Sequence, residues 1–337
     1  MTNDIETSAF GNGASEAGSI DSAANRLPLD ETRELLMIRV ARMAYHQDRT
    51  QKEIAAEIGL NRWQVSRLLQ EARDLGLVRI EILPRSQRSP DLETKLCAAY
   101  GLRDALVVTT ADQVAQAAGQ YLAALKPRIL RIGVSWGRTM AAVAQRLPHG
   151  WADGCEVVQI NGTVAPVPQA GHHNDVAETF ARKGGGRFVP LPVPAIVGAI
   201  ETREVLERDR IVADVLQLAR STPVMCFSLG ALDEESALLT SGNILPDELH
   251  TLLRAGAVGD VLGRFIDRNG RIVDLALDQR TIGLSLSDLK SRDHTICVVA
   301  GKRKHDVVLG ALRAGIITVL VTDAATANHA LEHAHDR

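Results

Sequence analysis

The stretch Ile129-Leu-Arg-Ile-Gly-Val-Ser-Trp-Gly-Arg-Thr139 decides the fold class of the chain. Its first half is short, aliphatic and unalternated, which is typical of a strand that helices cover on both faces. Its second half is a turn rich in Gly and Ser, and the segment after it, residues 140–147, predicts a helix. A strand that runs through such a turn into a helix is the repeating unit of an α/β sheet.

The same pattern recurs along residues 91–337. Further short aliphatic runs alternate with longer segments of helical spacing, and these runs are Ala105–Val108, Val157–Ile160, Val224–Leu229, Ile296–Ala300 and Ile316–Val321. The pattern predicts an α/β domain with a mostly parallel, doubly wound sheet.

Composition limits the class of protein. The chain has 337 residues, which is enough for two domains. Aromatic residues make up 3% of the chain, so aliphatic side chains must fill the core. Its 38 basic and 41 acidic residues give a formal net charge of −3, so any basic surface for nucleic acid must be local.

Several other classes are excluded. The four cysteines, Cys97, Cys155, Cys226 and Cys297, have no metal-site spacing and are expected to be buried thiols. No apolar run approaches the ~18–20 residues of a membrane span. Residues 1–29 lack the apolar core of a signal peptide and predict a disordered tail. We therefore expect a cytoplasmic protein with no membrane partner.

Residues 30–83 predict a small helical domain. A first helix runs to about His46, and Thr50-Gln-Lys-Glu53 is a capping box that opens a second helix. Gly59 is placed for a left-handed C-cap, and Asn61 for the N-cap of a third helix that reaches about Leu75. Two short helices joined by a tight Gly-containing turn form a helix-turn-helix.

The outer face of this motif predicts DNA binding, because Arg and Gln match guanine and adenine edges in the major groove. The expected DNA-binding residues are Thr50, Gln51, Lys52, Asn61, Arg62, Trp63, Gln64, Ser66 and Arg67. Val78–Ile82 alternates as a strand with one buried face and predicts a wing, and residues 84–90 predict a linker. The alternative is a solvated helical hairpin that carries arginines.

In the large domain, the turn formed by residues 133–139 follows the predicted strand 128–132, and it offers free amides, hydroxyls and the positive end of a helix to an anion. The residues expected there are Gly133, Ser135, Trp136, Gly137, Arg138 and Thr139. The same turn could instead cap a helix without a ligand. Asn161-Gly162 follows the next predicted strand, and an Asn-Gly pair is usually only a turn.

Two further segments carry charge. Gly256-Ala-Val-Gly-Asp260 places a carboxylate after a turn, where it could bind substrate hydroxyls or cap the following helix. Gly301-Lys-Arg-Lys304 puts basic residues at the start of a helix, against the helix dipole, and a bound phosphate would explain them. His172-His173 and Asp175 lack a third partner at helical spacing, so no metal is expected.

Taken together, these motifs resemble the SorC-type sugar-binding transcriptional regulators of bacteria, relatives of the central glycolytic gene regulators. The similarity runs from about Leu35 to the C-terminus. The segments that carry it are Thr50-Gln-Lys-Glu-Ile-Ala, Val65-Ser-Arg-Leu-Leu, Gly133-Val-Ser-Trp-Gly-Arg-Thr139, Leu191-Pro-Val-Pro194, Gly256-Ala-Val-Gly-Asp260, Ile282-Gly-Leu-Ser285, and Ala311-Leu-Arg through Val321-Thr-Asp323.

The resemblance implies a C-terminal domain similar to ribose-5-phosphate isomerase and glucosamine-6-phosphate deaminase. It also implies a phosphorylated sugar or related metabolite as effector, and usually a homotetramer on DNA. Trp63 departs from the small residue or Pro that the family more often has. The family also commonly has Gly-Gly before the helix-opening Lys, where this chain has Ala300-Gly301.

The expected function is a regulator of a carbohydrate catabolic operon that binds operator DNA and needs no cofactor. We expect the effector phosphate between the Ser135–Thr139 loop and Lys304, with Asp260 and Asn161 near the sugar hydroxyls. The alternative is a sugar-phosphate isomerase or deaminase with an added N-terminal domain, which would need a second acid–base partner beside Asp260. A nucleotide-binding module is a third possibility, but the chain lacks its phosphate-binding loops.

Overall fold

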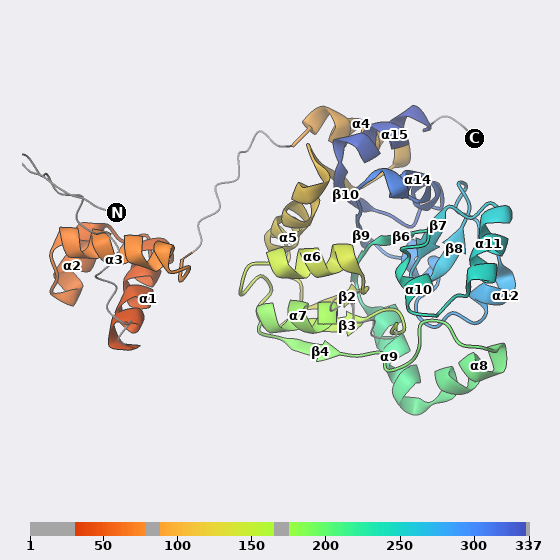
Figure 1. Ribbon diagram of the computed structural model, residues 1–337, viewed down its shortest axis with the longest axis horizontal. Helices are drawn as coiled ribbons and strands as arrows, with labels where there is room; N and C mark the ends of the chain where they lie inside the picture. The colour runs from red at the N-terminus through yellow and green to blue at the C-terminus, as the bar shows by residue number, and fades with distance from the viewer. Residues whose placement is uncertain (1–30, 79–87, 165–174, 335–337) are drawn as a thin grey trace, which may run out of the picture. The chain divides into compact units, whose positions relative to one another are not determined.

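The computed structural model describes residues 31–78, 88–164 and 175–334. The chain divides into two compact units between Leu83 and Pro84 (Figure 1). The predicted tail, Arg79–Ile82 of the predicted wing, the first part of the predicted linker and His172-His173 lie outside the described residues.

The first unit is a bundle of three helices, α1 (Glu31–Tyr45), α2 (Gln51–Ile58) and α3 (Arg62–Asp74). The predicted capping box of α2 is confirmed, because the Thr50 hydroxyl accepts from the Glu53 amide and the Glu53 carboxylate accepts from the Thr50 amide. Gly59 ends α2 with φ 72°, a left-handed conformation that favours glycine. The core of this unit is aliphatic and consists mainly of Met37, Val40, Ile54, Val65, Leu68, Leu69 and Ala72.

A seven-stranded sheet forms the centre of the second unit, and all its strand pairs are parallel. In sheet order the strands are β1 (Asp104–Val108), β10 (Val319–Asp323), β9 (His294–Val298), β5 (Val224–Phe227), β2 (Arg131–Val134), β3 (Glu156–Gln159) and β4 (Arg187–Val189). The predicted parallel sheet is confirmed. Each strand predicted for this sheet is present with shifted ends, and the short edge strand β4 was not predicted.

Helices cover both faces of this sheet (Figure 1), so neighbouring residues of one strand enter two different cores. On β1, for example, Val107 lies in one core and Leu106 in the other. The longer helices are α4 (Pro90–Tyr100), α5 (Val114–Ala124), α6 (Arg138–Arg146), α7 (Val176–Lys183), α8 (Ile200–Arg208), α9 (Arg210–Ser221), α11 (Pro246–Arg254), α14 (His305–Arg313) and α15 (Ala324–Glu332). Shorter ones are α10 (Ala237–Thr240), α12 (Leu275–Asp278), α13 (Leu286–Lys290) and the 3-10 turns Ala111–Gln113 and Lys302–Lys304. This burial on both faces explains why the strands show no alternation in the sequence.

A second, antiparallel sheet was not predicted. It consists of β6 (Leu229–Ala231), β7 (Gly259–Val261) and β8 (Arg264–Ile266). Asp260 lies in β7, so the alternative in which it caps a helix is wrong. Gly230 pairs with Asp260, and a Cβ at residue 230 would lie 1.7 Å from Asp260 Oδ1, so only glycine fits there.

The second unit begins before the predicted end of the linker. The amide of Ser89 donates to the carbonyl of Val107 at 2.8 Å, and Arg88 forms a β-bridge with Val108. Helix α4 then starts at Pro90, where a proline fits the first turn of a helix. Residues 88–90 are therefore part of the folded unit. Among the described helices, none has the length and apolar character that crossing a bilayer requires.

Candidate functional site

A cavity of about 500 Å³ opens where the central strands of the parallel sheet end. Strands β2, β5 and β9 are neighbours in the sheet, and Ser135, Ser228 and Ala300 follow their carboxyl ends into the cavity wall. Residues of the small sheet, Gly230 and Asp260 among them, complete the wall. Ligands of open α/β sheets bind at this edge of the strands.

Most of the predicted effector-binding residues meet in this cavity: Ser135, Trp136, Gly137, Arg138, Thr139, Asn161, Asp260 and Lys304. Gly133 and Gly162 do not line it, which corrects their expected contact with a ligand. A Cβ on Gly133 would lie 2.4 Å from the Met225 sulfur, so this glycine makes room for the Met225 side chain. The carbonyl of Gly162 accepts the Trp136 indole N–H at 2.6 Å and so fixes one side of the cavity.

The first turn of α6 faces the cavity. Gly137 precedes it with φ 125°, and no side chain caps the helix. The amides of a first turn have no partner within the helix, and the dipole makes this end positive. Arg138 and Thr139, which belong to the turn, also line the cavity. The turn therefore offers an anion both amides and charge.

Lys304 lies between the first turn of α6 and the end of β5. Its Nζ lies 3.2 Å from Thr139 Oγ1 and 3.4 Å from Ser228 Oγ. Burial lowers the pKa of the Lys304 ammonium, while Cys297 and Asp260 act in the opposite direction. A half-buried ammonium whose nearest partners are neutral hydroxyls still has capacity to bind an anion.

Asp260 and Asn161 supply buried oxygens. Burial raises the pKa of the Asp260 carboxyl to about 6, and the Gly263 amide and the Lys304 charge only partly offset this effect. The Gly263 N–H donates to Asp260 Oδ2 at 2.8 Å. Asn161 is 2% exposed, and its Oδ1 has no hydrogen-bond partner among the described residues. An unpaired buried oxygen is costly, so a donor from a ligand would stabilise it.

The segment from Ser228 to Leu238, which forms another wall of the cavity, was not predicted. Arg303 lines the cavity beside this segment, donates to Asp233 Oδ2 at 2.7 Å and also pairs with the Glu235 carboxylate. These contacts neutralise Arg303 and tie the segment to the turn before α14. The acidic run Asp233-Glu-Glu235 was the available signal, but its partner lies about 70 residues away in the chain.

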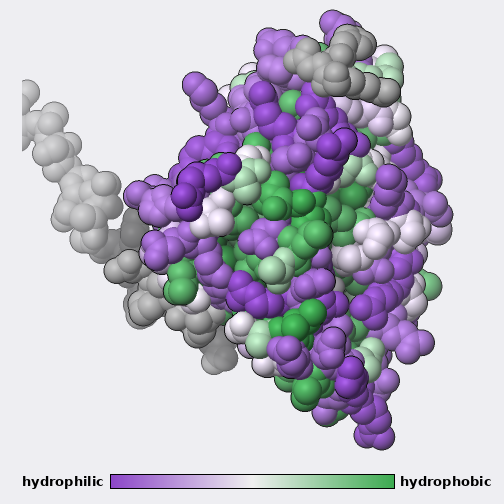
Figure 2. Space-filling model, turned by 90° about the vertical axis from the view of Figure 1, so that its right-hand side faces the viewer, coloured by the Kyte–Doolittle hydropathy of each residue, from purple (hydrophilic) through white to green (hydrophobic). Residues whose placement is uncertain are grey.

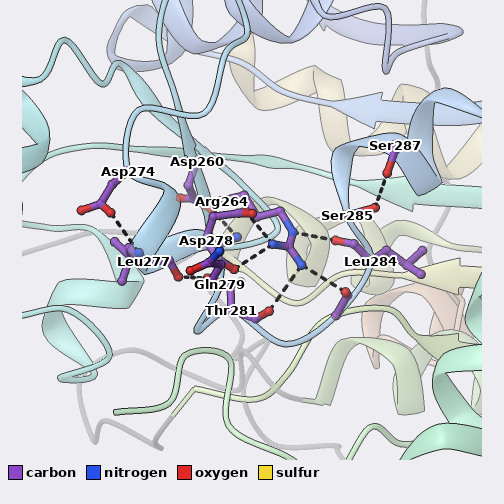
Figure 3. A network of polar contacts seen from close by, with 12 residues as sticks. Asp260, Arg264, Asp274, Leu277, Asp278, Gln279, Thr281, Leu284, Ser285 and Ser287 are labelled. Atoms are coloured by element: carbon purple, nitrogen blue, oxygen red, sulfur yellow. Dashed lines mark hydrogen bonds and ion pairs between the residues drawn. The ribbon is translucent and has the colours of Figure 1, made fainter. Parts of the chain in front are cut away.

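Arg264, the first residue of β8, is the centre of a buried network of polar contacts (Figure 3). Arg264 is 4% exposed, and it donates to the Leu284 carbonyl at 3.0 Å and to Asp278 Oδ1 at 2.6 Å. It also donates to the Gly283 carbonyl, and Gly283 forms a β-bridge with Asn161. Arg264 therefore holds the segment against which Asn161 packs.

On the first unit, the predicted DNA-binding side chains lie at the start of α2 and along the first part of α3, and all of them are exposed except for half-buried Gln51. Trp63 is 68% exposed, and the Arg67 guanidinium lies 5.6 Å from its ring centre while Arg67 also pairs with Glu71. Gln64 also completes the capping box of α3, a role that was not predicted. Its Oε1 accepts from the Asn61 amide at 2.9 Å, and Asn61 Oδ1 accepts from the Gln64 amide at 2.8 Å.

Comparison with known proteins identifies the family. Residues 85–332 match the family model described as "Putative sugar-binding domain". The Deoxyribonucleoside regulator of Bacillus subtilis (strain 168) is 31% identical over 307 residues, which cover 89% of this chain and 98% of that protein. The Sorbitol operon regulator of Klebsiella pneumoniae is 27% identical over 303 residues, which cover 87% and 96%.

A solved structure agrees with these matches. The full-length sorbitol operon regulator SorC from Klebsiella pneumoniae superposes with a TM-score of 0.69 at 27% identity, over 90% of this chain and all of that one. The chain therefore belongs to the SorC-type sugar-binding transcriptional regulators.

Proposed function

We propose that this regulator controls a carbohydrate catabolic operon, that its first unit binds operator DNA, and that a phosphorylated sugar or polyol binds the cavity of its second unit. One observation carries the proposal most: the first turn of α6 and the ammonium of Lys304 lie on the same cavity, with buried Asp260 and Asn161 in its wall. A small molecule with an anionic group and several hydroxyls would fit, because the anion could bind α6 and Lys304 while the hydroxyls bind Asp260 and Asn161.

The phosphate end is assigned to α6 and Lys304. Amides at a helix start and an ammonium group are both used by proteins to bind phosphate. Lys304 lies 3.2 Å from Thr139 Oγ1, so both can contact one phosphate group. Arg303 is less suited because Asp233 and Glu235 already neutralise it.

The sugar end is assigned to Asp260 and Asn161. A carboxylate accepts hydrogen bonds from hydroxyls, and an amide can both donate and accept. Because Asn161 Oδ1 is unpaired, a ligand hydroxyl would relieve its desolvation cost. These two residues would therefore select which sugar is accepted, while α6 and Lys304 would select for the phosphate.

Operator binding is assigned to α2 and α3 as a helix-turn-helix. Arg62, Ser66 and Arg67 are exposed on α3, the helix that would enter the major groove. The amide oxygen of Gln64 is already used by the helix cap, so this side chain retains only its N–H groups for DNA. The two-point contact with adenine that glutamine often makes would require release of the cap.

Self-association accompanies this role, because one recognition helix covers too few base pairs and paired half-sites need a two-fold axis. We propose a homo-oligomer, with the tetramer of the family resemblance as its expected size. The face of the second unit that carries α11 and α12 shows a hydrophobic hollow ringed by hydrophilic residues (Figure 2). Leu245, Leu253 and Leu275 are large exposed side chains in or beside these two helices, consistent with a contact surface.

The alternative of a sugar-phosphate isomerase or deaminase receives less support. Proton transfer between carbon atoms needs a positioned base near the bound sugar. Among the residues that line the cavity, the carboxylates are Asp233 and Asp260, and Asp233 is paired with Arg303. Asp260 is thus left without a second unpaired carboxylate among these residues, and we propose that the cavity binds without catalysis.

The test is operator binding by the full-length protein, using DNA from upstream of its own gene. Arg62→Ala should relax sequence specificity by ~1–3 kcal/mol. Lys52→Ala should weaken binding to all sequences and flatten its salt dependence. Phosphorylated sugars added to the complex should change its affinity. Unaltered operator affinity in both variants would show that α2 and α3 have been misassigned. No response to any phosphorylated sugar would remove the effector assignment.

A further inference from the structure

Three histidines stack between α14 and α15, outside the lining of the cavity. The ring centres of His305 and His329 are 4.7 Å apart, and those of His329 and His333 are 4.5 Å apart. The two helices are neighbours near the C-terminal end of the described chain (Figure 1). Because His329 and His333 are four residues apart, their side chains lie on one face of the helix and its end.

Two nitrogen atoms of this stack have unmet bonding capacity. Nε2 of His305 and Nε2 of His329 are buried, and neither has a hydrogen-bond partner in the described structure. His329 Nε2 lies 3.4 Å from Asp306 Oδ1, which also accepts a hydrogen bond from Arg268. Buried polar atoms are normally satisfied, so these two need an explanation.

His333 is oriented as a metal ligand would be. Its Nδ1 lies 2.9 Å from the carbonyl oxygen of His329. A carbonyl can only accept, so Nδ1 is the donor, and in the neutral ring Nε2 keeps the lone pair that a metal needs. Histidines that bind metals usually donate their other ring N–H to a carbonyl or carboxylate in this way.

We propose that His329, Glu332 and His333 bind a divalent transition metal ion of the zinc class. The candidate ligand atoms of these three residues lie within 4.8 Å of one another. Ligands of tetrahedral zinc are about 3.4 Å apart at bond lengths of ~2.1 Å, so modest side-chain rotations would complete the site. Two imidazoles with a carboxylate suit zinc and its neighbours rather than calcium or magnesium.

The order His329-Ala-Leu-Glu332-His333 supports the histidine pair, because the two histidines of His-x-x-Glu-His bind zinc on a helix in one class of zinc enzymes. His305, stacked on His329 with its own Nε2 unpaired, is the candidate for a fourth ligand. No metal was expected from the sequence, where only His172, His173 and Asp175 suggested a site. The fold unites His305 with residues some 24 positions later, which no local spacing could indicate.

The experiment is a calorimetric titration of the full-length, tag-free protein with zinc chloride after removal of metal by a chelator. We expect one ion per chain with a dissociation constant in the micromolar range or below. His329→Gln and His333→Gln should each weaken binding by at least about tenfold. Cobalt(II) added in place of zinc should give the intense absorption of a four-coordinate site.

Two controls and one further variant make the result decisive. As the first control, His149→Gln replaces an exposed histidine elsewhere and should leave zinc binding unchanged. A chain that ends at Ala334 should also bind normally, which excludes His335 as the cause. Glu332 is exposed, so Glu332→Gln should keep the fold and still weaken binding. The proposal fails if the natural protein binds no zinc, if the double variant of His329 and His333 binds as tightly, or if Glu332→Gln has no effect where the histidine variants do not fold.

Discussion

The most strongly perturbed carboxylate of the cavity is Asp260. In the folded chain burial raises the pKa of its carboxyl from 3.8 to about 6. Between these two values the folded state holds a proton that the unfolded state has lost. The free energy of unfolding therefore falls as pH rises through this interval, and the cost of the buried charge is fully present above pH 6.

Asp260→Asn should remove this pH dependence. At pH 7 the variant should be more stable than the natural protein, by at most about 3 kcal/mol, because an amide carries no buried charge and its oxygen can still accept from Gly263. Urea unfolding between pH 4 and pH 7 measures the difference. Asp214→Asn, which changes an exposed carboxylate on α9, is the matched control. If the stability of the natural protein and that of Asp260→Asn change with pH in the same way between pH 4 and pH 6, the effect given to Asp260 is contradicted.

At the scale of elements, Gln64 of α3 has two roles, one in the helix cap and one proposed in DNA binding. Gln64→Glu keeps the capping box, since glutamate at this position also accepts from the Asn61 amide. We expect the stability of the first unit to be retained while operator affinity falls through repulsion from phosphates. Gln64→Ala should instead lose ~1 kcal/mol of stability, within the usual range for a lost cap.

Thermal unfolding and operator titration of both Gln64 variants distinguish the two roles. Glutamate at residue 64 with full operator affinity at low salt would show that this face of α3 does not meet DNA.

The buried arginine of β8 predicts a remote effect on the cavity. Lysine cannot reproduce the planar fork with which Arg264 reaches Leu284, Asp278 and Gly283. Arg264→Lys should cost roughly 3–5 kcal/mol of stability, because buried carbonyls lose their donors. It should also weaken effector binding through Asn161, although Arg264 does not line the cavity. Arg268→Lys, at an exposed position, should do neither, and equal effects of the two variants would remove the role given to Arg264.

These elements show what the sequence could and could not predict. The parallel strands were predictable because each is a β-branched run buried on both faces. The caps at Thr50 and Asn61 were predictable because capping depends on residues close together in the chain. The strands β6, β7 and β8 are three residues each, too short for any periodicity. Arg264 resembles a surface residue in the sequence, and the pairing of Arg303 with Asp233 depends on contacts that only the fold creates.

At the scale of the whole molecule, the division into two units suits a protein that binds DNA with one and a small molecule with the other. We expect the chain to be at least a dimer in solution, because operator half-sites mirror a two-fold axis. Light scattering with and without operator DNA measures the mass. If α11 lies in the contact surface, Leu253→Glu should lower the measured mass. A monomer in both conditions would contradict the prediction.

The central claim is that the phosphate of the effector binds between the first turn of α6 and Lys304. Calorimetric titration of the full-length protein with matched pairs of phosphorylated and unphosphorylated sugars tests it most directly. We expect measurable binding of a phosphorylated member and far weaker binding of its unphosphorylated partner. Lys304→Met should abolish this preference while operator binding persists, and Thr139→Ala should weaken it by ~1 kcal/mol. Equal affinity for both members of every pair that binds, or a Lys304→Met variant that still prefers the phosphorylated sugar, would contradict the account.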